Sequence, residues 1–137
     1  MSAEIAFQTA LRLRLAGTPA VAALVPAECM LDRNERPAPD PSIIIGEMQA
    51  IDEGDSIARK LTRIYMDLHI WKKERSTAGV KAIAGEIRAA IRAGRLALAG
   101  GFHCVDCRVS SSRFLRDPGG EFSHGVVTID ALVEEAA

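Results

Sequence analysis

The segment FHCVDC, residues 102–107, combines residue types that can do chemistry at close spacing. It holds a histidine, an aspartate and two cysteines, Cys104 and Cys107, in C-x-x-C spacing. Such a pair can bind a metal ion or cycle between dithiol and disulfide, provided that a turn or a helix start brings both sulfurs together. The same residues could also form part of an ordinary β-strand, so the neighbouring sequence decides between these interpretations.

The residues around this segment favour a strand. Strand-forming residues continue to Phe114, and in a regular strand two residues three apart point to opposite faces. We therefore expect the sulfurs of Cys104 and Cys107 to point apart, and we interpret both as buried, inert thiols. No second cysteine pair or closely spaced histidine pair completes a zinc site, and the three histidines fall on separate predicted elements. We predict neither a metal site nor a cofactor.

Other catalytic patterns are incomplete. The serines at positions 110–112 lack the G-x-S-x-G context of a nucleophile, and GDSIARK, residues 54–60, lacks the spacing of a phosphate-binding loop. The acidic residues Asp52, Glu53 and Asp55 could bind a cation, but an EF-hand loop needs more ligands in register. We interpret this group as a solvated loop, and we predict that the protein is not an enzyme.

The hydrophobic pattern predicts the elements that position these residues. An amphipathic helix begins at Ala3 and ends before Gly17, and a second, short helix begins at Pro19. SIIIGEM is a β-branched strand, and the alternation in RIYMDLHIW indicates a second strand with one buried face. A period of about 3.6 residues then predicts a helix up to Gly94. Two further strands are joined by the turn RDPGGE.

This order, α(α)ββαββ, predicts an α+β fold in one domain, residues 1–137. We expect a four-stranded mixed sheet packed by an N-terminal helix and a central amphipathic helix. Because a helix between two strands usually returns the chain along one face of the sheet, the second and third strands should run parallel.

Charge and composition argue against several classes of function. Seventeen basic and eighteen acidic residues give a net charge of −1. A dedicated nucleic-acid binder needs a basic surface, whereas a weak charge suits a surface past which DNA slides without sticking.

Charged residues interrupt every apolar run, so we expect no membrane span and no signal peptide. Three cysteines without an export signal indicate a reducing compartment.

Some large side chains fall on the wetter face of the predicted strands. They are Tyr65, His69, Trp71, Val126 and Leu132. Half-exposed aromatic and aliphatic side chains of this kind are typical of a protein–protein interface. The alternative is that the N-terminal helices cover this face.

The order of the motifs resembles the tail-completion, or tail-terminator, family of long-tailed phages and gene transfer agents. The resemblance covers nearly the whole chain. It includes the opening helix, the proline-rich lead into PSIIIGEM, the strand ending in LHIW, the helix GVKAIAGEIRAAI and the closing SSRFLRDPGGEFSHGVVTIDALVEE. One departure is Ser42, where the family often has an aromatic residue.

The resemblance implies a structural virion protein without enzymatic activity, located in the tail of a phage or phage-like particle after assembly in the bacterial cytoplasm. We expect a homo-oligomeric ring, a hexamer, that caps the head-proximal end of the tail tube, ends its polymerisation and offers a surface for head–tail joining. Its partners would be the tail tube protein and the head–tail connector or stopper protein. DNA would pass through the central hole without specific binding, and no membrane is involved.

Loops positioned by a rigid sheet often carry recognition, so we predict partner contacts in two loops and at one strand end. The predicted contact residues are Asp52, Glu53, Asp55, Arg59, Lys60, Trp71, Arg116, Asp117 and Glu121. Two alternatives remain open from the sequence. One is another neck component, such as a head–tail adaptor or stopper, and the other is a small thiol- or metal-binding protein that uses Cys104 and Cys107.

Overall fold

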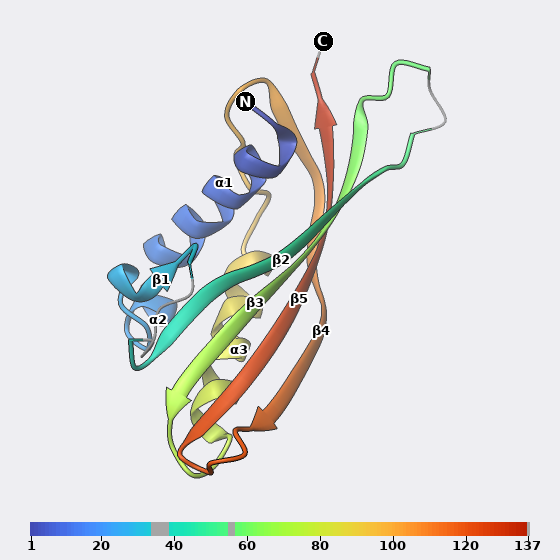
Figure 1. The fold of residues 1–137 in the computed structure, drawn as a ribbon. Coiled ribbons are helices and arrows are strands. Elements are labelled where there is room, and N and C mark those ends of the chain that lie inside the picture. The colour runs from blue at the N-terminus through green and yellow to red at the C-terminus, as the bar shows by residue number, and fades with distance from the viewer. Residues whose placement is uncertain (34–38, 55–56, 137) are drawn as a thin grey trace.

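Helices pack against one side of a long, twisted sheet in the computed structural model, which describes residues 1–33, 39–54 and 57–136 (Figure 1). The elements in chain order are α1 (Ala3–Gly17), α2 (Pro19–Ala22), the 3-10 turn η1 (Ala27–Cys29), β1 (Met30–Leu31), β2 (Ser42–Asp52), β3 (Leu61–Lys73), α3 (Ala78–Arg92), β4 (Phe102–Arg116) and β5 (Phe122–Glu135). The expected α+β fold with a mixed sheet and helical packing is confirmed. None of the helices in the described ranges is both long and apolar enough to cross a bilayer.

The sheet has five strands in the order β1-β2-β3-β5-β4, not the four that the sequence predicts. The additional strand is β1, which consists of Met30 and Leu31 and pairs in parallel with Ile43 and Ile44 of β2. All other neighbouring strands are antiparallel. A two-residue strand is too short to show an alternating pattern, and this explains why the sequence does not reveal it.

β3 and β4 run in the same direction, as predicted for the strands on either side of α3, but they are not neighbours. β5 lies between them and is antiparallel to both. The tight turn after β4 returns the chain directly as β5, which takes the position beside β3. β4 is consequently an edge strand along its whole length, and no other described strand pairs with its outer side.

The two long helices are joined to each other at their C-terminal ends. The side chain of Ser2 caps α1 by accepting a hydrogen bond from the Ile5 amide at 3.2 Å. At the other end of α1, the guanidinium of Arg14 donates to the main-chain carbonyls of Ala90, Gly94 and Arg95 at 2.8–3.1 Å. Ala90 lies in the last turn of α3, and Gly94 and Arg95 follow its end, where a cation is favourable because the helix dipole is negative there.

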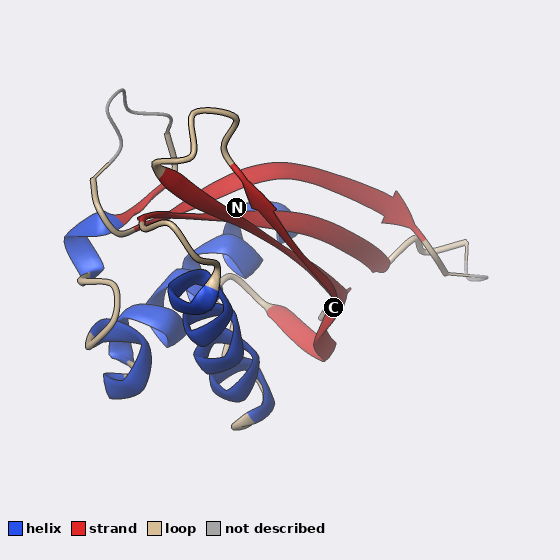
Figure 2. Cartoon of the chain, turned by 90° about the horizontal axis from the view of Figure 1, so that it is seen from below, coloured by secondary structure: helices blue, strands red, loops and turns tan. Residues whose placement is uncertain are grey.

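The core lies between these helices and one face of the sheet, which we call the inner face. Val80, Ile83, Ile87 and Ile91 line the buried stripe of α3, as its period predicts. Opposite them, alternate residues of β3 and β5 are fully buried. All the helices lie on the inner side (Figure 2), so the alternative in which the N-terminal helices cover the other, outer face is wrong.

Candidate functional site on the outer face of the sheet

The outer face of the sheet carries polar and aromatic side chains that interact across the strands. His69 and Trp71 of β3 and His124 of β5 are half-buried there, which confirms the face that the alternation predicts. Val126 and Leu132 lie on the same face by register. Val126 is only 3% exposed, so its neighbours cover it more completely than the sequence indicates.

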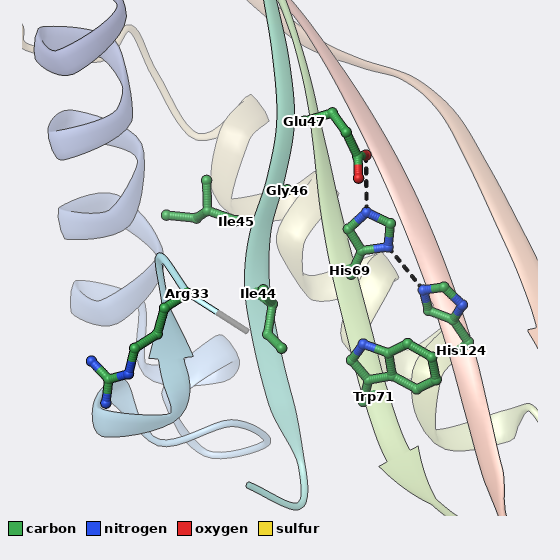
Figure 3. A pocket seen from close by; sticks show the side chains of 8 residues that line it. All are labelled: Arg33, Ile44, Ile45, Gly46, Glu47, His69, Trp71 and His124. Carbon is green, nitrogen blue, oxygen red and sulfur yellow. Dashed lines mark hydrogen bonds and ion pairs between the residues drawn. The ribbon is translucent and has the colours of Figure 1, made fainter. Parts of the chain in front are cut away.

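An aromatic and acidic cluster connects three strands near one end of this face (Figure 3). The Trp71 ring stacks on the His124 ring with their centroids 3.9 Å apart and their planes 7° apart. His124 Nε2 lies 2.9 Å from His69 Nδ1, and His69 Nε2 lies 3.1 Å from a carboxylate oxygen of Glu47. Each His69 nitrogen therefore has its own partner, which fixes the orientation of the imidazole ring.

The environment of this cluster changes the acidity of two of its members. The hydrogen bond from His69 lowers the pKa of the Glu47 carboxyl below its ordinary value. Burial lowers the pKa of His124, and the neighbouring His69 lowers it further. A cavity of about 400 Å³ lies against the cluster, so small solutes or ions can approach it from solvent.

Gly46 and a β-bulge bring Glu47 to the cluster. The register between β2 and β3 shifts between Ile45 and Met48, which changes the face that the intervening residues present. A Cβ atom placed on Gly46 would lie only 2.5 Å from Cδ2 of His69 and 2.7 Å from its Nε2. The imidazole therefore lies directly against the β2 backbone, and any larger residue at position 46 would push it away.

A second polar cluster lies further along the same face. Asp130 of β5 is 6% exposed and accepts hydrogen bonds from Arg63 at 2.7 Å and Arg108 at 3.4 Å. Arg63 also pairs with Glu53, and the hydrogen bonds to Glu53 and Asp130 raise the pKa of its guanidinium. A buried carboxylate with two guanidinium partners joins β3, β5 and β4 across the face.

The predicted contact residues are divided between the two ends of the sheet. One group lies at the β2–β3 hairpin, which extends past the helices (Figure 1): Asp52, Glu53, Arg59 and Lys60. The other group lies at the opposite end, where β3 ends and the β4–β5 turn begins: Trp71, Arg116, Asp117 and Glu121. Asp55 lies outside the described residues. The structure therefore brings the predicted residues together as two separate surfaces.

The hairpin surface has a defined backbone and exposed side chains. Arg59 adopts a left-handed conformation with φ 55° and pairs with Asp52 at 2.8 Å. The Lys60 carbonyl accepts a hydrogen bond from the Glu135 amide at 2.8 Å, which attaches the base of the hairpin to the end of β5. Ile57, 94% exposed, presents an apolar side chain beside these charges. Exposed apolar side chains next to charges are a common feature of interfaces.

The surface at the other end is organised by the β4–β5 turn. The Asp117 amide donates to the Phe122 carbonyl at 3.0 Å, and the Gly120 amide donates to the Asp117 carbonyl at 2.8 Å. Gly120 has φ 74°, a value that favours glycine. The turn predicted from RDPGGE is confirmed. It exposes Arg116 and Glu121 at its two ends.

The prediction that Cys104 and Cys107 point apart is wrong. The register of β4 against β5 shifts between Cys104 and Asp106, so Val105 is an extra, bulged residue. Cys104 then pairs with Val133 and Cys107 with Ala131, two positions on the inner face. Both cysteines contact the core, and the strand prediction itself is correct.

The two thiols interact with each other. The closeness of the two thiols lowers the pKa of Cys104 and raises the pKa of Cys107, and burial raises the latter further. The Cys104 thiol donates a hydrogen bond to the Asp106 carbonyl at 3.4 Å. A cavity of about 260 Å³ beside them is lined in part by Arg95 and Leu96. Cys104 is only 1% exposed and Cys107 is half-buried. Reagents can therefore reach the pair mainly through Cys107.

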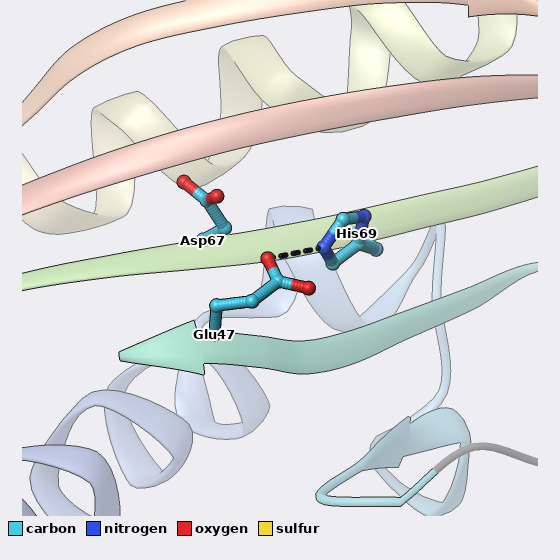
Figure 4. Close-up of side chains that lie close together, drawn as sticks. All are labelled: Glu47, Asp67 and His69. Atoms are coloured by element: carbon cyan, nitrogen blue, oxygen red, sulfur yellow. Dashed lines mark hydrogen bonds and ion pairs between the residues drawn. The ribbon is translucent and has the colours of Figure 1, made fainter. Parts of the chain in front are cut away.

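Sequence reasoning missed the contacts that link the histidines. His69 and His124 are 55 residues apart and fall on different strands, and only the β3–β5 register brings them together. The available signal was the alternation, which places both on the same face. Within the described ranges, the residues whose ligand atoms could hold one metal ion together are Glu47, Asp67 and His69 (Figure 4).

Comparison with known proteins identifies relatives of the whole fold. A family model described as "Tail completion protein gp17" matches residues 9–134. A chain from the structure entitled "Virion of native gene transfer agent (GTA) particle" is similar to this chain with a TM-score of 0.84 at 19% identity, over 97% of this chain and 98% of that chain. A search of curated proteins finds no match.

A second solved structure has the same fold with larger differences. The gp17 protein of bacteriophage SPP1 is similar with a TM-score of 0.62 at 20% identity, over 94% of this chain and 89% of that chain. At these identities the two structures establish a common fold. The family model, which covers most of the chain, establishes the family and confirms the resemblance described from the sequence motifs.

Proposed function

The chain belongs to the tail completion protein gp17 family, and on this premise we propose that it is a structural protein that caps the head-proximal end of a tail tube as a closed ring. The observation that carries the proposal is the family match over residues 9–134. In this role the ring stops polymerisation of the tube and offers its other side to the head–tail connector or stopper protein. The role needs no catalytic step.

Ring formation is supported by the two sheet edges. Among the described residues, no strand pairs with the outer side of β4, and β1 pairs with the outer side of β2 only at Ile43 and Ile44. The outer side of Ile45–Asp52 therefore has no described partner strand, while its other side pairs with β3. A free edge can bind another strand through main-chain hydrogen bonds. Because the two edges differ, their contact would be heterologous, and repeated heterologous contacts with a suitable rotation close into a ring. We propose a hexamer.

The positions of the two contact surfaces are consistent with two different partners. The hairpin surface, with Ile57, Arg59 and Lys60, and the turn surface, with Arg116 and Glu121, lie at opposite ends of the sheet. A ring that separates a tube from a connector needs one contact surface on each side. We propose that these two ends make those contacts, and Asp55, in the hairpin sequence, belongs to the same proposal.

The charge of the chain suits a ring through which DNA passes. A net charge of −1 gives no strong attraction to phosphates, so DNA would move through the hole without specific binding. Strong basic surfaces, in contrast, hold DNA through the release of counterions.

The experiment is assembly with purified proteins. Native mass spectrometry and electron microscopy of the chain, alone and with assembled tail tubes, should show closed rings of six subunits and densities at one end of each tube. A chain that stays monomeric alone but forms rings on tubes also supports the proposal. Tubes that remain uncapped at saturating protein would refute it, and binding to the connector alone would indicate an adaptor or stopper.

A further inference from the structure

Three potential metal ligands meet on the outer face of the sheet. One oxygen each of Glu47 and Asp67 and one nitrogen of His69 all lie within 4.8 Å of one another. Asp67 and His69 are two residues apart on β3 and therefore share the outer face. Glu47 reaches them from β2 at the bulge (Figure 4). Two carboxylates so close together repel each other, and a bound divalent cation would remove that repulsion.

Groups on β5 and β2 hold two of these side chains, those of Asp67 and His69, in place from behind. The Thr128 hydroxyl donates to Asp67 at 2.6 Å, and His124 Nε2 lies 2.9 Å from His69 Nδ1. Hydrogen bonds of this kind to the far side of a ligand are typical of metal sites, where they orient the imidazole or carboxylate. The contact of His69 with the Gly46 backbone restricts the ring on its other side.

Space and access are also present. The cavity of about 400 Å³ includes Glu47, His69 and His124 in its lining (Figure 3). A second cavity of about 380 Å³ is lined in part by Glu47, Asp67 and Thr128. Glu47 lines both cavities, so an ion with its water ligands can reach the three side chains from solvent. Glu47 is exposed, while Asp67 and His69 are half-buried. The site thus has one exposed ligand at its mouth and two half-buried ligands with hydrogen-bond partners on β5.

We propose that Glu47, Asp67 and His69 bind a divalent transition-metal ion, with Zn²⁺ as the probe, and that water completes the coordination. One nitrogen and two carboxylate oxygens form a mixed ligand set that Zn²⁺ accepts, and three protein ligands with one open position are common for this ion. The ion would join β2 to β3 at the bulge, where their regular pairing is interrupted. This inference is independent of the proposed ring.

The test is titration of the purified full chain with ZnCl₂ at neutral pH. Calorimetry measures the binding, and the melting temperature is measured with and without zinc. Wild type should bind one zinc per chain and melt at a higher temperature with zinc. Glu47→Gln, Asp67→Asn and His69→Gln should each weaken binding by about tenfold or more, and Thr128→Val, which removes the hydrogen bond to Asp67, should weaken it by about tenfold. Gly46→Ala should also weaken binding because its methyl group displaces His69.

Two control variants separate this site from other zinc ligands. His103→Gln removes an exposed histidine on β4 and should leave binding unchanged. Cys104→Ser/Cys107→Ser should also leave it unchanged, because the thiols lie on the inner face. The proposal is overturned if wild type shows no saturable zinc binding. It is also overturned if Cys104→Ser/Cys107→Ser loses zinc binding while the variants of Glu47, Asp67 and His69 keep it, or if those three variants bind zinc as wild type does.

A measurement on wild type covers the case in which a variant does not fold. Mn²⁺ added to the isotope-labelled chain should broaden the backbone signals of residues 46–48 and 66–70 and of their β5 partners 126–128 before all others. Co²⁺ should give a spectrum without the thiolate-to-cobalt band that a cysteine site produces. Broadening centred elsewhere, or a thiolate band, would overturn the proposal.

Discussion

Ser42 carries a fully buried hydroxyl that has no hydrogen-bond partner among the described residues. A buried polar group without a partner costs about 1–3 kcal/mol in desolvation. Ser42→Ala removes the hydroxyl and changes the volume little, so the free energy of unfolding, measured by urea denaturation, should stay the same or rise by about 1 kcal/mol.

Ser123 is the matched control for this prediction. It is 1% exposed, and its hydroxyl donates to the Lys72 carbonyl at 3.4 Å. Ser123→Ala leaves that carbonyl with one partner fewer, so it should lower the free energy of unfolding by about 1 kcal/mol. The interpretation of Ser42 fails if Ser42→Ala destabilises the protein as much as Ser123→Ala does.

Asp130 tests the importance of the polar cluster on the outer face. It is 6% exposed and has two guanidinium partners, so Asp130→Ala leaves Arg63 and Arg108 without their shared carboxylate. We expect the free energy of unfolding to fall by about 1.5–3 kcal/mol, because the substitution removes the charged acceptor of two hydrogen bonds, although Arg63 keeps its pair with Glu53. Urea denaturation at neutral pH measures this change.

Glu53 provides the comparison, because it pairs with the same Arg63 from a position where its side chain is 41% exposed. Exposed ion pairs contribute about 0–1 kcal/mol, so Glu53→Ala should change stability by no more than that. If Asp130→Ala and Glu53→Ala lower the free energy of unfolding equally, burial does not make the Arg63–Asp130 contact stronger than the Arg63–Glu53 contact.

At the scale of the elements, the bulge in β4 makes a specific prediction about chain length. Val105 is the extra residue between Cys104 and Asp106, which pair with the consecutive residues Val133 and Leu132 of β5. Deletion of Val105 would remove this bulge and leave the same residues on each face, while the second bulge of β4, between Val109 and Ser111, would remain. We expect this variant to fold, with a free energy of unfolding within about 2 kcal/mol of wild type, since Val105 is 38% exposed.

Deletion of Arg108 is the control, because Arg108 is not a bulged residue. To absorb this deletion, β4 must move Cys107 out of the inner face, or must use its second bulge at Ser110 and move Val109 out of that face. Either change removes an apolar side chain from the core, and the deletion also removes the Arg108–Asp130 pair, so it costs more than removal of the Val105 bulge. Urea denaturation and circular dichroism compare the two variants. If both deletions destabilise the fold equally, the bulge is not where the register changes.

The β2–β3 hairpin is the element that we expect to contact the tube or a neighbouring subunit. Arg59→Glu/Lys60→Glu should reduce binding to assembled tubes by about tenfold or more in co-sedimentation, because it reverses two exposed charges at the proposed contact. The melting temperature should change little, since the Arg59–Asp52 pair is exposed and the hydrogen bond at Lys60 uses the main chain.

Arg75→Glu/Arg88→Glu makes the same change in charge at two exposed positions outside both contact surfaces. This variant should bind tubes as wild type does. Equal binding by wild type and both double variants would count against the hairpin as a contact, and equal loss in both variants would indicate an effect of total charge alone.

The sequence predicts most elements of this fold because their periods are regular. The alternation of Ile64, Met66, Leu68 and Ile70 and the 3.6-residue period of α3 each reflect one buried face. The errors occur where the period is interrupted. One extra residue at Val105 reverses the predicted orientation of Cys107 relative to Cys104.

The outer-face cluster was beyond sequence reasoning for a different reason. The contact between His69 and His124 depends on which strand lies next to β3, and β5 occupies that place although α3 and β4 precede it in the chain. Glu47 reaches His69 only because of a second bulge. Strand order and bulges are set by packing over the whole sheet, which local patterns do not report.

At the scale of the whole molecule, the fold provides one covered face, one polar face and two different free edges. The covered face holds the hydrophobic core, and the free edges are surfaces through which identical subunits could associate. In the proposed ring, the two predicted contact surfaces at opposite ends of the sheet would form two distinct sides.

The most direct test of the account is the length of the tails in particles produced without this protein. The coding sequence is deleted from the producing strain, and tail lengths and head attachment are measured by electron microscopy, with the wild-type chain restored in a control. We predict tubes that grow beyond the normal length and do not join heads, with both defects corrected in the control. Tails of normal length attached to heads in the deletion strain would contradict the proposed function.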